Sequence, residues 1–235
     1  MERIGLDYEA AHQINPKLVY AEVTGYGRSG PWRDKPGQDL LVQCLSGLTW
    51  LSGNRDAGPT PLGLAVVEIL CGAHLVQGSL AALVRRGKTG QGARVEVSLL
   101  ASALDYQFEV LTTHLNDGKL LPARSQLANG HPYLAAPYGV HKTLDGYIAL
   151  AMGPLPQVAD ALECNALHTF DAPEGWFTHR DEIKQVIAAC LAEKKTEVWL
   201  EQLEKSGIWC SPVLDYQQLI SGEGYQVLQM ELTDP

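Results

Sequence analysis

The chain has 235 residues, of which 46% are hydrophobic and 19% are charged, and its formal net charge is -9. This hydrophobic share can build a sizeable core in one large domain or two modest ones, and the ordinary charge content argues against a disordered chain. The acidic balance excludes a broad nucleic-acid-binding face, which needs clustered cations. It still allows a phosphorylated small molecule held by a few local cations.

No sequence feature indicates a metal site or a disulfide framework. The five cysteines lie far apart and form no C-x-x-C pair, and the seven histidines show no H-E-x-x-H spacing. The first stretch, "MERIGLDYEAAHQINP", is polar and does not resemble a signal peptide. We therefore expect no metal, reduced thiols and a cytoplasmic protein.

The first part of the chain has the pattern of an α/β layer. Residues 18–24 are apolar and β-rich, and the glycine-rich "GYGRSGP" that follows is typical of a loop. Apolar residues recur at helical spacing over 38–51, and a long helix is predicted over 64–86. Residues 93–99 alternate like a half-buried strand. The order strand, helix, helix, strand favours an α/β fold.

The second part has a different pattern. A further helix is predicted over 99–115 and is followed by a polar linker. The stretch 136–152 is typical of a hairpin with its turn at Leu144-Asp145-Gly146. Two amphipathic helices over 180–193 and 196–205 and a short strand complete a smaller α+β domain.

The run from Leu62 to Val84 is long and apolar enough to raise the question of a membrane span. Glu68, His74, Gln77 and three glycines lie inside it. Polar residues in that density argue for a buried helix of a soluble protein, so no membrane is expected.

Glu68 is the single acid in the apolar stretch "PLGLAVVEILCGAHL". An ionised group is costly to bury, so the residue allows two interpretations. It can be an exposed acid in the first turn of a helix, where it interacts favourably with the helix dipole. Alternatively it lies in a pocket, because Gly72 one turn later leaves room for another backbone or a ligand. Spacing by itself favours the first interpretation.

Ordered motifs along nearly the whole chain resemble the family III (CaiB/BaiF-like) CoA-transferases, the group that includes formyl-CoA transferase. The motifs are "RIGLDYEAAHQINPKLVYAEVTGYGRSGP", "KPGQDLLVQCLSGL", "PLGLAVVEILCGAHLVQGSLAALVRRGKTGQGARVEVSLL" and "APYGVHKTLDGYIALAMG". The resemblance implies a Rossmann-like large domain that binds CoA, a smaller α+β domain and an interlocked homodimer.

The resemblance also implies that the chain is an internal or truncated portion of such a protein. The expected organisation is a partial large domain over 1–98, a linker helix and linker over 99–127, a small α+β domain over 128–219, and the start of a return segment over 220–235. A portion of this kind is expected to associate, either as a homodimer or with a full-length partner.

Three residues take roles from the resemblance. Glu68 matches the carboxylate nucleophile, which attacks an acyl-CoA thioester and passes CoA to a second carboxylic acid through an acyl anhydride and an enzyme-CoA thioester. The family residue is usually aspartate, and the extra methylene of glutamate extends the reach by about 1.5 Å. Gln38 matches a position beside the thioester, where it can donate a hydrogen bond. Arg3 matches a contact to a CoA phosphate.

Two other functions stay open at this point. One is a catalytically silent relative that acts only by associating with a partner. The other is an enzyme like α-methylacyl-CoA racemase, which is a member of the same family. The racemases carry a histidine at the position of Gln38, and glutamine cannot act as a base, so the residue disfavours racemisation.

Overall fold

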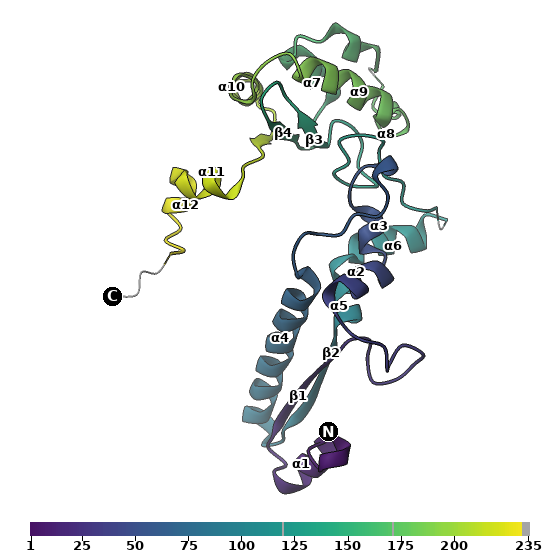
Figure 1. Ribbon diagram of the computed structural model, residues 1–235, viewed down its shortest axis with the longest axis vertical. Coiled ribbons are helices and arrows are strands. Elements are labelled where there is room, and N and C mark those ends of the chain that lie inside the picture. The colour runs from purple at the N-terminus through teal and green to yellow at the C-terminus, as the bar shows by residue number, and fades with distance from the viewer. Residues whose placement is uncertain (119, 171, 232–235) are drawn as a thin grey trace. The chain divides into compact units, whose positions relative to one another are not determined.

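The computed structural model describes residues 1–118, 120–170 and 172–231. The chain divides into two compact units (Figure 1). The first comprises Met1–Gly53 and Ala57–Pro122, and the second comprises Asn54–Asp56 and Ala123–Pro235.

The first unit is built on two parallel strands, β1 (Val19–Thr24) and β2 (Ala93–Ser98). Parallel strands need a long crossover connection, and here it contains α2 (Asp39–Leu45), α3 (Leu48–Leu51) and the long α4 (Val66–Thr89). Helix α4 runs alongside both strands (Figure 1). The predicted order of strand, helices and strand is therefore confirmed.

The register of the two strands places Glu22 opposite Glu96. Like charges at directly opposite positions destabilise a strand pair, so cations are needed between them. Arg94 meets this need, because its Nη2 lies 2.7 Å from Glu22 Oε1 and its Nε lies 2.7 Å from Glu96 Oε1. Arg28 adds a second, longer pair of contacts to the same two carboxylates.

Two predicted helices are each divided in the structure. The helix predicted over 38–51 is interrupted at Gly47, whose φ of 85° is left-handed and favours glycine. The helix predicted over 99–115 is α5 (Leu99–Tyr106) followed by α6 (Phe108–Asn116). Helix α5 packs against α4, so residues 99–122 belong to the first unit. The predicted linker over 99–127 therefore differs from the structure, in which only its last residues leave this unit.

Short elements that the sequence analysis did not predict complete this part of the chain. They are η1 (Glu2–Ile4), α1 (Tyr8–Ile14) and η2 (Arg55–Ala57), and most of η2 belongs to the second unit. Asp7 caps α1, because its Oδ1 accepts a hydrogen bond from the Ala10 amide at 3.0 Å.

Helix α4 is buried along one side only. Val67, Cys71 and Ala82 are buried and recur at the spacing of one helix face. Ile69, Val76, Leu80 and Val84 lie on the other side and are 57–64% exposed. The expectation of a buried helix therefore holds for one face, and the opposite face is an exposed apolar stripe within the described residues.

The second unit contains a three-stranded antiparallel sheet in the order β3-β4-β5. Strands β3 (Gly139–Lys142) and β4 (Tyr147–Leu150) form the predicted hairpin, and β5 (Cys210–Pro212) is the predicted short strand. The helices of the unit are α7 (Leu155–Ala161), η3 (Asn165–Phe170), α8 (Gly175–Thr178), α9 (Arg180–Leu191), α10 (Thr196–Lys205), α11 (Tyr216–Ser221) and α12 (Glu223–Gln226).

One hydrophobic core holds this second unit together. It joins Ile148 of β4 to Ile183 and Ile187 of α9 and to Trp199 of α10, each at most 1% exposed. The indole of Trp199 donates a hydrogen bond to the Leu191 carbonyl at 2.9 Å, which satisfies its polar atom inside the core.

Helix α9 also holds the polar loop that precedes the sheet. Lys184 is fully buried, and its Nζ donates to Ser125 Oγ at 2.8 Å and to the Ala128 carbonyl at 3.0 Å. Arg180 donates to the Pro132 carbonyl at 2.6 Å. A stretch with the composition of a flexible linker is thus ordered by two cations of one helix.

Candidate active site

Glu68 lies in the first turn of α4 with its side chain exposed. The helix begins at Val66, so Glu68 is its third residue. An added Cβ at Gly72, one turn further, would meet no heavy atom within 4 Å. The structure therefore matches the first interpretation, an exposed acid in the first turn, and it leaves the space beside Gly72 open without enclosing Glu68 in a pocket.

The start of α4 is held by a side chain from another helix. Asp39, the first residue of α2, is 3% exposed, and its Oδ2 accepts hydrogen bonds from the amides of Val67 at 2.8 Å and Glu68 at 3.0 Å. The residue before the helix is Ala65, which has no side-chain acceptor, so Asp39 supplies the missing cap from 28 residues away in the sequence.

Gln43 extends this network to the segment that leads into α4. It lies one turn after Asp39 on the same face of α2 and is 2% exposed. Its Nε2 donates to Asp39 Oδ1 at 2.5 Å and to the Leu64 carbonyl at 3.2 Å, while its Oε1 accepts from the Leu62 amide at 2.9 Å. Segment 62–64 is therefore fixed against α2 before the helix begins.

Gln38 is the N-cap residue of α2. Its Oε1 accepts a hydrogen bond from the Leu40 amide at 3.0 Å, and the side chain is otherwise exposed. Gln38 directly precedes Asp39, which accepts from the Glu68 amide, so the start of α2 lies beside the start of α4.

A close backbone contact sets the position of α2. A Cβ at Gly25 would lie 2.6 Å from the Cα of Gly37, so only glycine fits where the loop after β1 returns to the start of α2. Thr24 Oγ1 also accepts a hydrogen bond from the Gly27 amide at 2.9 Å inside this loop. The glycine-rich loop after β1 therefore delivers Gln38 and Asp39 beside α4.

Arg3 opens onto a cavity of about 510 Å³ in the first unit. Four arginines line this cavity, together with two carboxylates: Arg3, Arg28, Arg33 and Arg94, with Asp7 and Glu22. Arg94 is engaged by Glu22 and Glu96, whereas the Arg33 side chain is 63% exposed. Guanidinium groups suit phosphate oxygens because they donate several hydrogen bonds in a planar fork.

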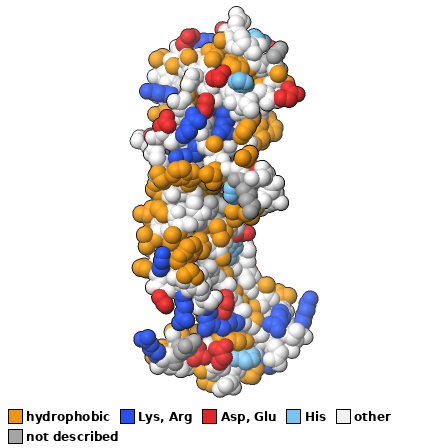
Figure 2. Space-filling model, turned by 90° about the vertical axis from the view of Figure 1, so that its right-hand side faces the viewer, with side chains coloured by type: hydrophobic (Ala, Val, Ile, Leu, Met, Phe, Trp, Pro, Cys, Tyr) orange, Lys and Arg blue, Asp and Glu red, His pale blue; other side chains and the backbone are white. Residues whose placement is uncertain are grey.

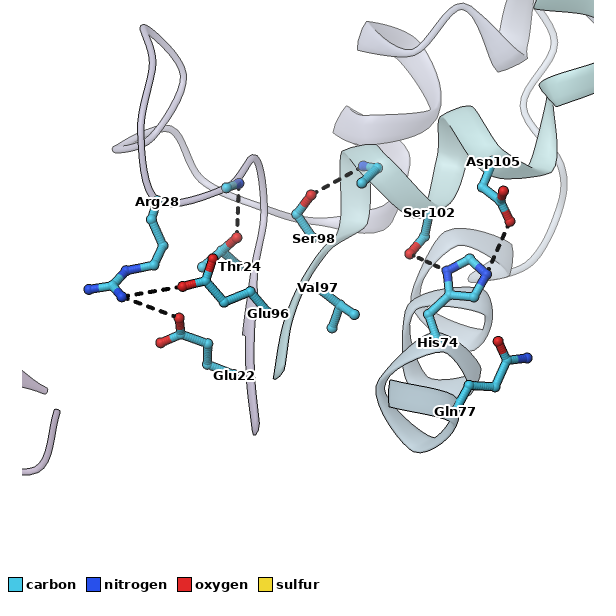
Figure 3. A pocket seen from close by; sticks show the side chains of 12 residues that line it. Glu22, Thr24, Arg28, His74, Gln77, Glu96, Val97, Ser98, Ser102 and Asp105 are labelled. Atoms are coloured by element: carbon cyan, nitrogen blue, oxygen red, sulfur yellow. Dashed lines mark hydrogen bonds and ion pairs between the residues drawn. The ribbon is translucent and has the colours of Figure 1, made fainter. Parts of the chain in front are cut away.

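A second cavity, of about 560 Å³, opens at the carboxyl ends of β1 and β2. Figure 3 shows His74 of α4 between two side chains of α5. Its Nδ1 lies 2.9 Å from Ser102 Oγ, and its Nε2 lies 3.2 Å from Asp105 Oδ2. Ser102 is only 2% exposed, which argues against a role as a nucleophile. Sequence reasoning missed this cluster, because its members lie on two different helices.

The described residues hold no group of three or more His, Cys, Asp and Glu side chains arranged for a metal ion. The arrangement that they do hold is an accessible carboxylate at a fixed helix start, in the same unit as an arginine-lined cavity.

Comparison with known proteins agrees with the motifs. The model of CoA-transferase family III matches residues 1–233. The chain belongs to this family.

Two family III relatives illustrate the match. The chain is 32% identical over 222 residues to an acetyl-CoA:oxalate CoA-transferase of Acetobacter aceti, which covers 92% of this chain and 56% of that protein. It is 30% identical over 229 residues to a succinate–glutarate CoA-transferase of Agrobacterium fabrum, which covers 94% of this chain and 56% of that protein. The chain therefore spans little more than half the length of the curated relatives it matches.

A solved structure shows the same family III fold. A CaiB/BaiF family protein from Brucella suis matches with a TM-score of 0.79 at 25% identity, over 98% of this chain and 62% of that one. The predicted family and the predicted α/β class are thereby confirmed.

Proposed function

We propose that this chain carries the nucleophile of an acyl-CoA:carboxylate CoA-transferase, and that the nucleophile is Glu68. The observation that carries the proposal is the placement of Glu68, whose exposed side chain stands at a fixed helix start beside the open space at Gly72. Family membership supplies the reaction class. A glutamate carboxylate is as competent a nucleophile as the aspartate that family members usually carry.

The proposed reaction passes through four acyl transfers. A Glu68 oxygen attacks the thioester carbonyl of the donor, the C–S bond breaks and CoA leaves as thiolate, so an acyl-glutamyl anhydride forms. The thiolate attacks the glutamyl carbonyl and releases the donor acid, which leaves a glutamyl-CoA thioester. The acceptor carboxylate attacks this thioester and expels the thiolate, and the thiolate then attacks the acceptor acyl group. The acceptor leaves as its CoA thioester and Glu68 is regenerated.

Gln38 and Arg3 have supporting roles in this proposal. The Gln38 oxygen accepts from the Leu40 amide, so its Nε2 group remains as a donor toward a thioester oxygen. Arg3 binds a phosphate of CoA, and the cavity that it shares with Arg28 and Arg33 supports that assignment. Gln38 also disfavours the racemase alternative, because its amide side chain cannot act as a base.

We further propose that the protein is cytoplasmic and self-associates. The exposed apolar stripe of α4 supports association, because an uncovered stripe of this kind is unfavourable in water. Further hydrophobic side chains gather in patches on the face drawn in Figure 2. Helix α4 is long and apolar enough to span a membrane, but core helices of soluble proteins also have this length and composition.

The silent-relative alternative predicts association without catalysis, so an assay of CoA transfer separates it from the transferase.

Covalent trapping tests the nucleophile. The chain is incubated with acyl-CoA and then with hydroxylamine, and peptide mass spectrometry locates the hydroxamate. We expect modification at Glu68, complete loss in E68Q, and retention in E68D, because aspartate is the usual family residue. The matched control is E109Q, which removes an exposed first-turn acid from α6. Unmodified Glu68 under these conditions would refute the assignment.

A further inference from the structure

The first turn of α4 satisfies its amides in an unusual way. A helix start leaves free N–H groups that a local cap usually accepts. Here the Ile69 amide bonds to the Ala65 carbonyl at 3.1 Å, and the amides of Val67 and Glu68 both donate to Asp39. A side chain from α2 therefore occupies the donors that lie closest to the candidate nucleophile.

A glutamate at the third helical position has a competing use. Such a side chain can fold back toward the positive helix start, and in a capping box it accepts a hydrogen bond from the N-cap amide, which in α4 is that of Ala65. A carboxylate bonded in this way points along the helix, and the hydrogen bond to the backbone donor makes it a weaker nucleophile. Attack on a thioester needs the opposite state, a carboxylate that extends away from the helix and is free of backbone donors.

We propose that Asp39 is a positioning residue whose negative charge, held against the first amides of α4, keeps the Glu68 carboxylate extended and away from the helix start. The inference rests on the proposed function for its catalytic consequence. Asp39 is suited to this role because it is 3% exposed and its second oxygen is held by Gln43 at 2.5 Å. Its negative charge also occupies the positive end of the helix dipole and repels a second carboxylate from it.

Gln43 supports this position of Asp39, because each polar group of its side chain faces a complementary group. Its NH₂ group faces the Asp39 carboxylate, and its oxygen faces the Leu62 amide. In D39N the introduced NH₂ group faces the NH₂ group of Gln43, so two donors oppose each other. In D39N/Q43E the introduced carboxylate accepts from both the introduced NH₂ group and the Leu62 amide, and the negative charge moves to the second position. The donor to the Leu64 carbonyl is lost, so the complementary pattern is restored only in part.

Kinetics test the catalytic half of the inference. A displacement of about 1 Å at a reacting group costs about 100-fold in rate. We expect D39N to lower kcat for CoA transfer at least 10-fold with the KM for acyl-CoA unchanged within twofold, and D39N/Q43E to recover part of the lost kcat. The matched control is D145N in the second unit. Asp145 also caps a helix start from outside, because it accepts from the Thr196 amide at 2.8 Å, and its loss should leave kcat unchanged.

Two measurements that need no turnover test the structural half. Hydrogen exchange at the Val67 and Glu68 amides should become at least 10-fold faster in D39A. Coupling of Glu68 to glycine ethyl ester by a water-soluble carbodiimide should become slower, because the carboxylate then folds back onto the freed amides. Circular dichroism checks that each variant is folded. If D39A does not fold, the comparison of D39N with D39N/Q43E still tests the inference.

The outcomes separate this inference from the proposed function. Unchanged exchange and coupling in D39A, or unchanged kcat in D39N, would overturn the role of Asp39 even where the parent chain transfers CoA. A parent chain that neither transfers CoA nor yields trapped Glu68 would overturn the proposed function, and the catalytic half of the inference with it. Faster exchange with slower coupling in D39A would then still establish the contact itself.

Discussion

Burial of His141 makes the second unit sensitive to acid. The side chain is 1% exposed in β3, and Nε2 lies 3.0 Å from the Pro137 carbonyl, which can only accept, so Nε2 carries the proton. Within the described residues Nδ1 has no hydrogen-bond partner. Burial lowers the pKa of His141 from 6.5 to about 4, the bond to Pro137 opposes this shift, and the charge of Lys184 adds to it.

The magnitude follows from proton linkage. Below pH 6.5 the unfolded chain binds a proton at His141 that the folded chain binds only near pH 4, so stability is lost as the pH falls through this window. With these two pKa values, lowering the pH from about 7.5 to about 5 costs about 2 kcal/mol of unfolding free energy from this one residue. The largest loss, reached below pH 4, is about 3.4 kcal/mol.

Urea titrations of the parent chain, H141Q and H168Q at both pH values measure this contribution. H141Q keeps a donor for the Pro137 carbonyl but does not titrate, so its loss of stability on acidification should be about 2 kcal/mol smaller. H168Q removes a histidine whose side chain is 45% exposed and should follow the parent chain. Parallel pH dependences for the parent chain and H141Q would refute the reasoning.

Two further predictions concern a buried cation and two helical glycines. Burial, together with the charge of Arg180, lowers the pKa of Lys184 from 10.5 to about 8, against the attraction of Asp181. The unfolded chain therefore binds more protons between these values, so stability should rise by about 2 kcal/mol between pH 7.5 and 9.5, and K184M should lack this rise in urea titrations. Gly72 and Gly87 of α4 both face open space, so G72A and G87A should each stabilise the helix by about 1 kcal/mol in the same assay. Only G72A should lower CoA transfer, because it fills the space beside Glu68, and equal activities would show that this space is not used.

Much of the secondary structure could be predicted because its signals are local. Alternation in β1 and β2, the helical spacing of α4, and the turn at 144–146 each depend on residues within about one turn or one strand pair of each other. The break at Gly47 was harder to predict, because a single glycine inside a helical pattern is often tolerated. Short helices such as α1 carry too few residues to show a period.

The candidate site divides in the same way. The sequence by itself determined which residue is the candidate nucleophile, since Glu68 stands inside a motif that resembles the family at a single definite position. It also determined the lack of a base at Gln38. The tertiary structure decided what surrounds Glu68, because Asp39 reaches its amide from 29 residues away.

The contacts of the buried polar residues were likewise decided by the tertiary structure alone. Lys184 and Ser125 are 59 residues apart in the sequence, yet Lys184 Nζ lies 2.8 Å from Ser125 Oγ. No sequence motif links the two residues. Partners at such separations are chosen by how the helices pack, and packing depends on all the elements of a unit together rather than on any short stretch. Local sequence therefore specified the elements and the candidate nucleophile, whereas packing specified the cap, the cavities and the contacts of the buried charges.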